Sequence, residues 1–238
     1  MRKFKDCYIA FLDVLGFKEL LKSQEENLCE KIAKCFDEIQ EQYNITVNKT
    51  GEYLIEPLSV KQKVMSDSIC FYVEASVPNA LAGLIATCDY FQVKMLRQNP
   101  PILTRGAIAR GELYAEKDVL FGKGFVKAYL MEENTARNPR IIITKQLIKQ
   151  SSTLNNHGKD YIRRFTFTDE DDFVVLDYLY IFYGFCHEHE DWKNFATHVY
   201  EKLDYETDVS IRNKYQYLRK NIERVRKKFI DNGDFNNA

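Results

Sequence analysis

The sequence predicts an α+β domain built on a βαββαβ unit, with a helical extension at its C-terminal end. Three observations lead to this prediction. Short apolar runs alternate with segments whose apolar residues recur every three or four positions. One stretch between two such segments has the pattern of a β-hairpin. Beyond about residue 186 the chain becomes polar and helical.

The elements of the βαββαβ unit follow in order along the first 150 residues. We expect strands at residues 7–14, 102–114 and 139–143, and a hairpin over about 44–74 whose second arm is KVMSDSICFYV. We expect helices at residues 24–43, 78–97, 124–135 and 144–150. This order is that of the ferredoxin-like split βαβ unit, extended at its C-terminal end.

The rest of the chain predicts one more strand pair and a helical region. The segment FTFTDEDDFVVLDYL fits two strands joined by the acidic turn 169–172, which we expect to be solvated. In the last helix, apolar residues form a heptad seam: Ile211, Tyr215, Leu218, Ile222, Val225 and Phe229. This helix either packs on its own domain with a solvated basic face, or forms a dimer or faces an anion. We place the main domain at residues 1–185 and the helical extension at 186–238.

Composition excludes several classes of protein. With 34 Lys+Arg against 35 Asp+Glu, the chain lacks the charge footprint of a nucleic-acid binder. Its longest apolar stretch, residues 173–186, is too short to span a bilayer. No export signal is visible, so we expect a cytoplasmic protein with no membrane partner. The six cysteines form no CxxC pair and are expected to be buried and reduced.

Two carboxylates stand out by their position. Asp13 ends an apolar strand, and Asp67 lies inside the expected strand KVMSDSICFYV. A carboxylate in a buried strand is costly unless it is paired or binds a metal. In a βαββαβ sheet the first and third strands are neighbours, so both side chains can reach one edge and bind Mg²⁺ or Mn²⁺ together. The alternative is that one Asp caps a turn and the other pairs with a buried cation.

Several segments in order resemble the catalytic domain of class III nucleotide cyclases. They are FLDVLGF, KVMSD, TRGAIARGELY, FGKGFVKAYLME and PRIIITKQL, within residues 7 to 150. The resemblance implies a ferredoxin-like cyclase domain that binds a nucleoside triphosphate and two Mg²⁺ or Mn²⁺ ions. It also implies a homodimer with its active sites at the subunit interface.

The resemblance assigns roles to particular residues. Asp13 and Asp67 bind the metal ions, with Val14 as a further metal position. The turn Val14, Leu15, Gly16 and Phe17 contacts the triphosphate, and Lys63, four residues before Asp67, reads the base.

The chain also departs from the family pattern. The helix after the glycine-bearing strand carries Lys127 where the family has a catalytic Asn, and no Arg follows one turn later. The acidic base-reading position is Val119, with Asp118 displaced by one residue. This mixture resembles the short bacterial Pycsar cyclases of anti-phage defence, which make cyclic CMP or cyclic UMP. It therefore implies a pyrimidine substrate, UTP or CTP.

A cyclase also needs cations for the charge that develops on the phosphoryl group. The candidates are Lys127, Arg105, Arg110, Arg137 and Arg140, of which we favour Lys127 as catalytic and Arg140 as substrate-binding.

Two other functions are open: a catalytically silent cyclase-like domain that binds a nucleotide or a protein, and another palm-type nucleotidyltransferase. A metal site in HEHED, residues 187–191, is not favoured, because its alternate residues point to different faces of a helix.

Overall fold

We describe the fold from a computed structural model, which describes residues 3–18, 30, 33–34, 60–117 and 119–231. The helix expected at 24–43 and the first arm of the expected hairpin region lie largely outside the described residues. The following elements are seen in the rest of the chain. The strands are β1 (Lys5–Val14), β2 (Lys61–Met65), β3 (Ser68–Glu74), β4 (Thr104–Glu116), β5 (Val119–Phe121), β6 (Ile141–Ile143), β7 (Thr166–Thr168) and β8 (Val174–Leu176). The helices are α3 (Ala80–Leu96), α4 (Lys123–Thr135), α5 (Lys145–Lys149), α6 (Asn156–Arg164), α7 (Tyr178–Cys186), α8 (Glu190–Tyr205) and α9 (Val209–Asp231).

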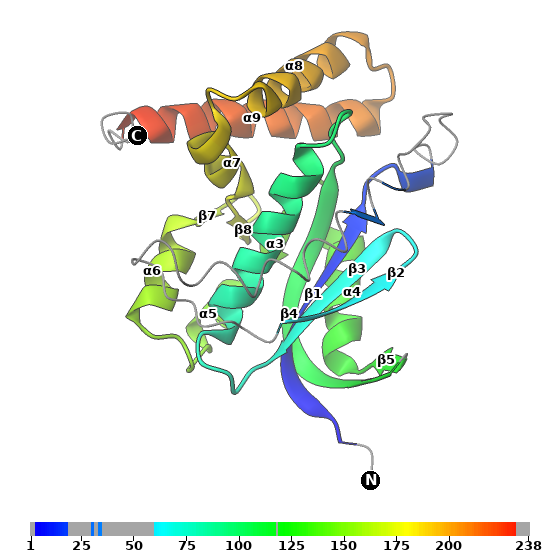
Figure 1. Cartoon of the computed structure of the whole chain (residues 1–238), viewed down its shortest axis with the longest axis vertical. Helices are drawn as coiled ribbons and strands as arrows, with labels where there is room; N and C mark the ends of the chain where they lie inside the picture. Colours follow the sequence, from blue (N-terminus) through cyan, green and yellow to red (C-terminus); the bar gives the residue numbers. More distant parts are fainter. Residues whose placement is uncertain (1–2, 19–29, 31–32, 35–59, 118, 232–238) are drawn as a thin grey trace.

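The central sheet confirms the predicted α+β class and strand arrangement. Its order is β2-β3-β1-β4-β6-β8-β7, with β5 paired to the far end of β4 (Figure 1). The first four strands are antiparallel and have the order of a ferredoxin-like sheet, with β1 and β3 as central neighbours. β6 continues the sheet parallel to β4, and the β7–β8 hairpin ends it.

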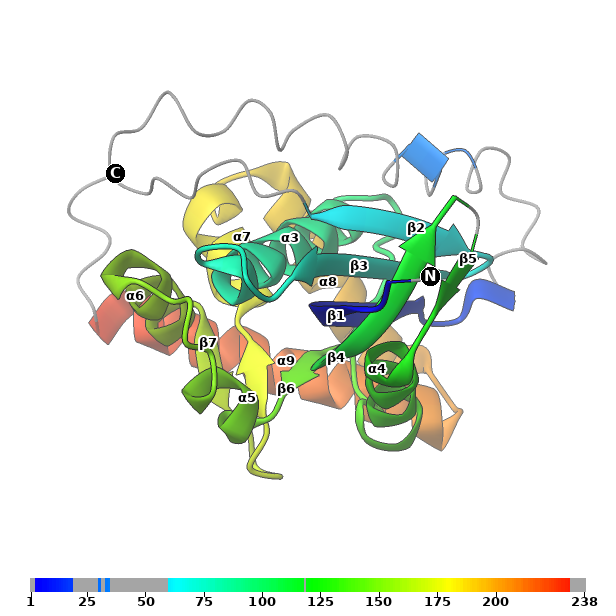
Figure 2. The ribbon, with the colours of Figure 1, turned by 90° about the horizontal axis from the view of Figure 1, so that it is seen from below.

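Helices cover both faces of this sheet. α3 lies on one face and α4 on the other (Figure 2). The apolar stripe predicted for α3 is completely buried, including Leu84, Cys88 and Phe91. On the other face, α4 approaches β4 closely through Gly111 and Gly124. A Cβ at Gly111 would come within 2.8 Å of the Gly124 Cα, so both positions require glycine.

The C-terminal helices pack onto the same domain rather than standing apart. α7, α8 and α9 share an apolar cluster with Leu96 of α3 and with Leu103, which precedes β4. The seam of α9 is buried from Tyr215 to Phe229, which confirms that this helix packs on its own domain. Ile211, the first residue of the seam, is 38% exposed. No helix in the described part of the chain is long and apolar enough to cross a membrane.

One strand prediction is wrong in a way that affects the site. The segment KVMSDSICFYV is not a single strand, because β2 ends at Met65 and β3 begins at Ser68. Asp67 therefore lies in the tight turn between them, beside Ser66, which has a φ of 57°. A turn leaves a carboxylate partly solvated, so the cost that we expected for burying this Asp in a strand does not arise.

Candidate active site

The two predicted aspartates meet at one edge of the sheet. Asp13 is the penultimate residue of β1 and lies opposite Ser68 of β3, the residue that follows Asp67. The Val14 N–H donates a hydrogen bond to the Asp67 carbonyl, with an N···O distance of 3.0 Å, and so ties the end of β1 to the hairpin turn. Burial raises the pKa of Asp13, and the charge of Asp67 adds to this rise. The two carboxylates therefore repel each other.

Asp13 belongs to a partly buried ion-pair cluster. Arg105, opposite Asp13 on β4, donates from Nε to Asp13 Oδ2 at 3.3 Å. The same Nε lies 2.7 Å from Oε1 of Glu132 in α4. The Glu132 side chain is only 4% exposed, and Oε1 has no hydrogen bond of good geometry with any described group. Burial raises the pKa of Glu132 to about 7, against the opposing effect of Arg105.

Glu132 is a site residue that the sequence interpretation missed. It lies four residues after Ala128 and eight after Gly124, and all three are the buried residues of α4. The sequence did contain a signal for this residue. Residues four apart lie on the same face of a helix, so Glu132 continues a stripe of small residues that is expected to face the sheet.

The turn after Asp13 has the expected shape. Gly16 has a φ of 74°, a left-handed conformation that favours glycine, and it is exposed. The amides of Val14 and Leu15 are already used, since the Leu15 N–H donates to the Leu103 carbonyl at 2.9 Å. Gly16 and Phe17 follow at the start of the next helical turn.

The other predicted site residues are not gathered around Asp13 of the same chain. Lys63 on β2 donates from Nζ to the Lys117 carbonyl at 3.0 Å, which brings it to the turn before Val119 and β5. Lys127 is exposed on α4, where it lines a groove with Val126 and Leu130.

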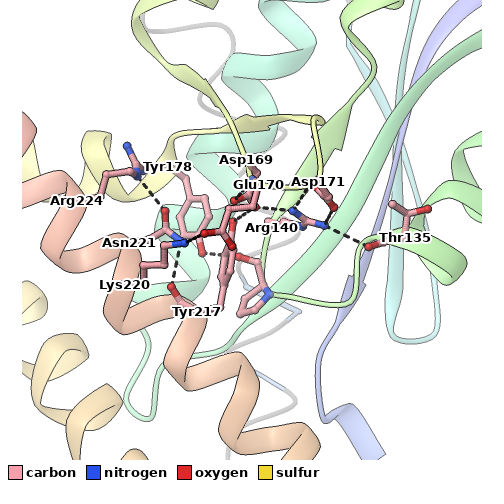
Figure 3. A network of polar contacts seen from close by, with 11 residues as sticks. Thr135, Arg140, Asp169, Glu170, Asp171, Tyr178, Tyr217, Lys220, Asn221 and Arg224 are labelled. Atoms are coloured by element: carbon pink, nitrogen blue, oxygen red, sulfur yellow. Dashed lines mark hydrogen bonds and ion pairs between the residues drawn. The ribbon is translucent and has the colours of Figure 1, made fainter.

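Arg140 occupies a position different from the one we expected for a phosphate-binding residue. Its side chain is 6% exposed and pairs with Asp169 and Asp171 of the β7–β8 turn (Figure 3). The Arg140 Nη1 to Asp171 Oδ1 distance is 3.0 Å. Tyr217 of α9 donates to Asp169 at 3.0 Å, with its ring beside the Arg140 guanidinium. An arginine engaged in this way has no free donor pair for a substrate, so we leave Arg140 out of the candidate site.

The same contacts add to the interpretation of the acidic turn 169–172. The turn is largely solvent-exposed, as we expected, with the Glu170 and Asp172 side chains 83% and 81% exposed, but its carboxylates also link three parts of the fold. Asp169 and Asp171 bind Arg140, Glu170 pairs with Lys220 of α9, and Asp172 pairs with Lys145 of α5. Opposite charges that lie far apart in sequence meet here because the β7–β8 hairpin ends beside α9 (Figure 3).

The donor set at the sheet edge fits a divalent cation held together with a phosphate ligand. Asp13 and Asp67 provide hard oxygen donors, and their mutual repulsion is the kind that a cation relieves. No group of three or more His, Cys, Asp or Glu residues suited to a metal occurs among the described residues, HEHED included. Mg²⁺ is commonly bound by one or two carboxylates plus substrate phosphates, so two aspartates are sufficient.

Comparisons with known proteins give the following. No family model matches the sequence, and no curated protein matches it. Among solved structures, the chain is similar to the adenylyl cyclase CyaB from P. aeruginosa, with 15% identity, a TM-score of 0.44, and 69% of this chain and 84% of that chain covered. It is similar to the catalytic core of a rhodopsin-guanylyl cyclase with converted specificity in complex with ATPalphaS, with 14% identity, a TM-score of 0.46, and 73% and 96% covered.

A third solved structure is a class III adenylyl cyclase-like ATP-binding protein from Pseudomonas aeruginosa. The identity is 7%, the TM-score is 0.41, and 74% of this chain and 39% of that chain are covered. At these identities and TM-scores, the likeness is one of fold alone.

Proposed function

We propose that the chain is a divalent-metal-dependent nucleotide cyclase, which converts a nucleoside triphosphate to a 3′,5′-cyclic nucleotide and pyrophosphate. One observation carries this proposal: Asp13 and Asp67 meet at one sheet edge, directly before the turn at Gly16. Such a juxtaposition provides carboxylates for metal ions and backbone amides for phosphate oxygens at the same place. The sequence resemblance to class III cyclases rests on these same residues.

In this proposal the chain binds and positions the substrate. Asp13 and Asp67, with Val14, would hold two Mg²⁺ or Mn²⁺ ions. When bound, these ions lower the pKa of the ribose 3′-hydroxyl and neutralise the triphosphate. Gly16 and Phe17 would orient the triphosphate chain through their amides. Arg105 provides a cation at the edge of the site, held in place by Glu132.

We further propose a pyrimidine triphosphate, UTP or CTP, as the substrate. The Nζ of Lys63 contacts the turn before β5, and Val119 of β5 is 52% exposed. If this surface contacts the base, Val119 provides no acceptor for the adenine amino group. An unpaired donor in a closed pocket costs about 1–3 kcal/mol, which disfavours ATP. By the same resemblance, we propose a cytoplasmic role in anti-phage defence.

We also propose that the active protein is a homodimer. Lys127 lies on the outer face of α4, whereas Asp13 and Asp67 lie at the sheet edge, so one chain does not gather both halves of the site. Exposed apolar side chains of Phe121, Val126 and Leu130 line the same groove as Lys127, and Val119 of β5 and Tyr129 of α4 are exposed as well. An apolar surface of this kind is typical of an interface, and a second copy would bring its own aspartates to it.

A second candidate function is a cyclase-like module that binds nucleotide or protein without turnover. The observation that favours it is the absence of the expected Asn and Arg on α4, where Lys127 and Met131 stand instead. Without those groups, the charge on the transferring phosphoryl group lacks its usual partners.

One experiment separates these functions. The purified chain is incubated with each of the four nucleoside triphosphates and Mn²⁺, and the products are identified by mass. We expect cyclic UMP or cyclic CMP, and we expect no product from Asp13→Ala or Asp67→Ala. Nucleotide binding without product in the wild type favours the silent module, and a linear nucleotidyl product favours a palm-type transferase. Full turnover by either Ala variant contradicts the proposed metal site.

A further inference from the structure

A hollow of about 620 Å³ is lined by α5, α6, β7 and the residues that connect the two helices. We call it the α6 hollow; its lining residues lie within 148–154, 159–168 and at Val174. These elements stand together at the end of the sheet opposite β2 (Figure 1 and Figure 2). In the sheet order β7 is four strands away from β1, which is about 19 Å at the ordinary strand spacing. The α6 hollow is therefore separate from the candidate active site, with which it shares no residue.

One side of the α6 hollow is apolar and held in place by the core. Leu154, Ile162 and Val174 line it and belong to the buried cluster beneath α3, and Ile148 packs against the same cluster. The volume of the hollow falls within the range of about 300–1,000 Å³ that is usual for small-molecule sites. The α6 hollow can therefore bury an apolar or planar organic group.

The rim of the α6 hollow is positively charged. Lys149, Lys159 and Arg163 line it, and none of the described lining residues is an Asp or a Glu. Neither lysine forms an ion pair within the part of the chain that the structure describes. Arg163 pairs with Asp160 at 3.0 Å, but the two side chains are 82% and 58% exposed, so this pair holds the guanidinium only weakly. The α6 hollow thus combines an apolar side with positive charge that is not neutralised locally.

A buried hydroxyl group also lines the α6 hollow. Ser151 is 8% exposed, and its Oγ accepts a hydrogen bond from the Tyr8 hydroxyl at 2.9 Å. The proton of the Ser151 hydroxyl is therefore free to be donated, and no described residue accepts it. A buried donor that lacks an acceptor is costly, and an oxygen atom of a ligand would relieve that cost. Thr166 is not equivalent, because its hydroxyl already donates to the Ile162 carbonyl at 2.6 Å.

We propose that the α6 hollow binds a small phosphate monoester whose organic part is apolar or planar. The organic part packs on the apolar side, and the phosphate group binds the cations of the rim, with the Ser151 hydroxyl as a further donor. A phosphate dianion suits this arrangement better than a single carboxylate does, because it offers more charge and more acceptor oxygens to several separate donors. This inference does not depend on the proposed function, since it uses no residue of the candidate active site.

The test measures the binding of 1-naphthyl phosphate by titration calorimetry, with EDTA present so that no metal ion is held at the candidate active site. We expect it to bind the wild type at least about tenfold more tightly than inorganic phosphate or 1-naphthol, because each of these retains only one part of the ligand. Lys149→Glu/Lys159→Glu should weaken this binding by at least about tenfold. Lys193→Glu/Lys227→Glu makes the same change of charge at exposed positions of α8 and α9, outside the hollow, and should bind as the wild type does.

Each outcome bears on the inference directly. An affinity of Lys149→Glu/Lys159→Glu within twofold of wild type overturns it, and so does an equal loss in the control variant, because the effect is then one of general charge. Weaker binding in Asp13→Ala places the probe in the candidate active site and also overturns it. Failure of the wild type to bind 1-naphthyl phosphate overturns it as well, whether or not the protein makes a cyclic nucleotide.

A parallel titration with uridine monophosphate identifies the source of the phosphate group. Binding of this nucleotide that is lost in Lys149→Glu/Lys159→Glu supports the site and points to a nucleotide ligand. Binding of 1-naphthyl phosphate alone, with the same loss in that variant, supports the site and points to a more apolar ester.

Discussion

Replacing Glu132 by Gln should stabilise the protein in a pH-dependent way. The Glu132 carboxyl is 4% exposed, and its pKa is raised from an ordinary value of 4.5 to about 7, chiefly by burial. The folded state therefore binds this proton more tightly than the unfolded state does. The stability that comes from the protonated form is complete below about pH 4.5 and is lost as the pH rises through about 7. Glutamine carries no such charge.

The size of the effect follows from the pKa difference. At 1.36 kcal/mol per pKa unit, ionising Glu132 costs the fold at most about 3 kcal/mol above pH 7. For a chain of this length, 1 kcal/mol corresponds to about 2–4 °C in melting temperature. We therefore expect Glu132→Gln to melt at nearly the wild-type temperature at pH 4.5, and at a higher temperature at pH 8, by up to about 6–12 °C.

The assay is a series of thermal melts between pH 4.5 and 8, without divalent metal, followed by circular dichroism. Glu133→Gln is the matched control, because Glu133 is the exposed neighbour on the same helix. Its melting temperature should follow that of the wild type at every pH. A difference between Glu132→Gln and wild type that does not change with pH would refute the assignment of this buried carboxyl.

Two further predictions concern the extension and the assembly. Asp177→Asn should lower the stability by about 3 kcal/mol, because Arg224 donates two hydrogen bonds to this fully buried carboxylate. Glu170 is exposed, so Glu170→Gln should change the free energy of unfolding, measured in urea, by less than about 1 kcal/mol. Equal effects of Asp177→Asn and Glu170→Gln would contradict the larger contribution of Asp177. If the site is shared between two chains, mixing inactive Asp67→Ala with inactive Lys127→Ala should restore part of the cyclase activity. Mixtures that stay inactive, or an active monomer by light scattering, would contradict the shared site.

The sequence by itself determined most of the elements that the structure describes, and it placed the two aspartates at one edge of the sheet. The apolar period of α3 predicted its buried face, since a face of this kind depends only on spacing within one helix. The neighbouring positions of β1 and β3 predicted that Asp13 and Asp67 share one sheet edge. Both inferences use local spacing together with one rule about strand order, and neither requires a particular long-range contact.

Only the tertiary structure decided which charges are paired. Arg140 binds Asp169 and Asp171, some thirty residues further along the chain, although its place before a buried strand favoured a phosphate contact. Arg105 of β4 meets Glu132 of α4, which packs on the face of the sheet. The energy of a charge pair depends on its distance and burial, and these are set by how helices and strands pack together. Spacing along the sequence carries no record of either quantity.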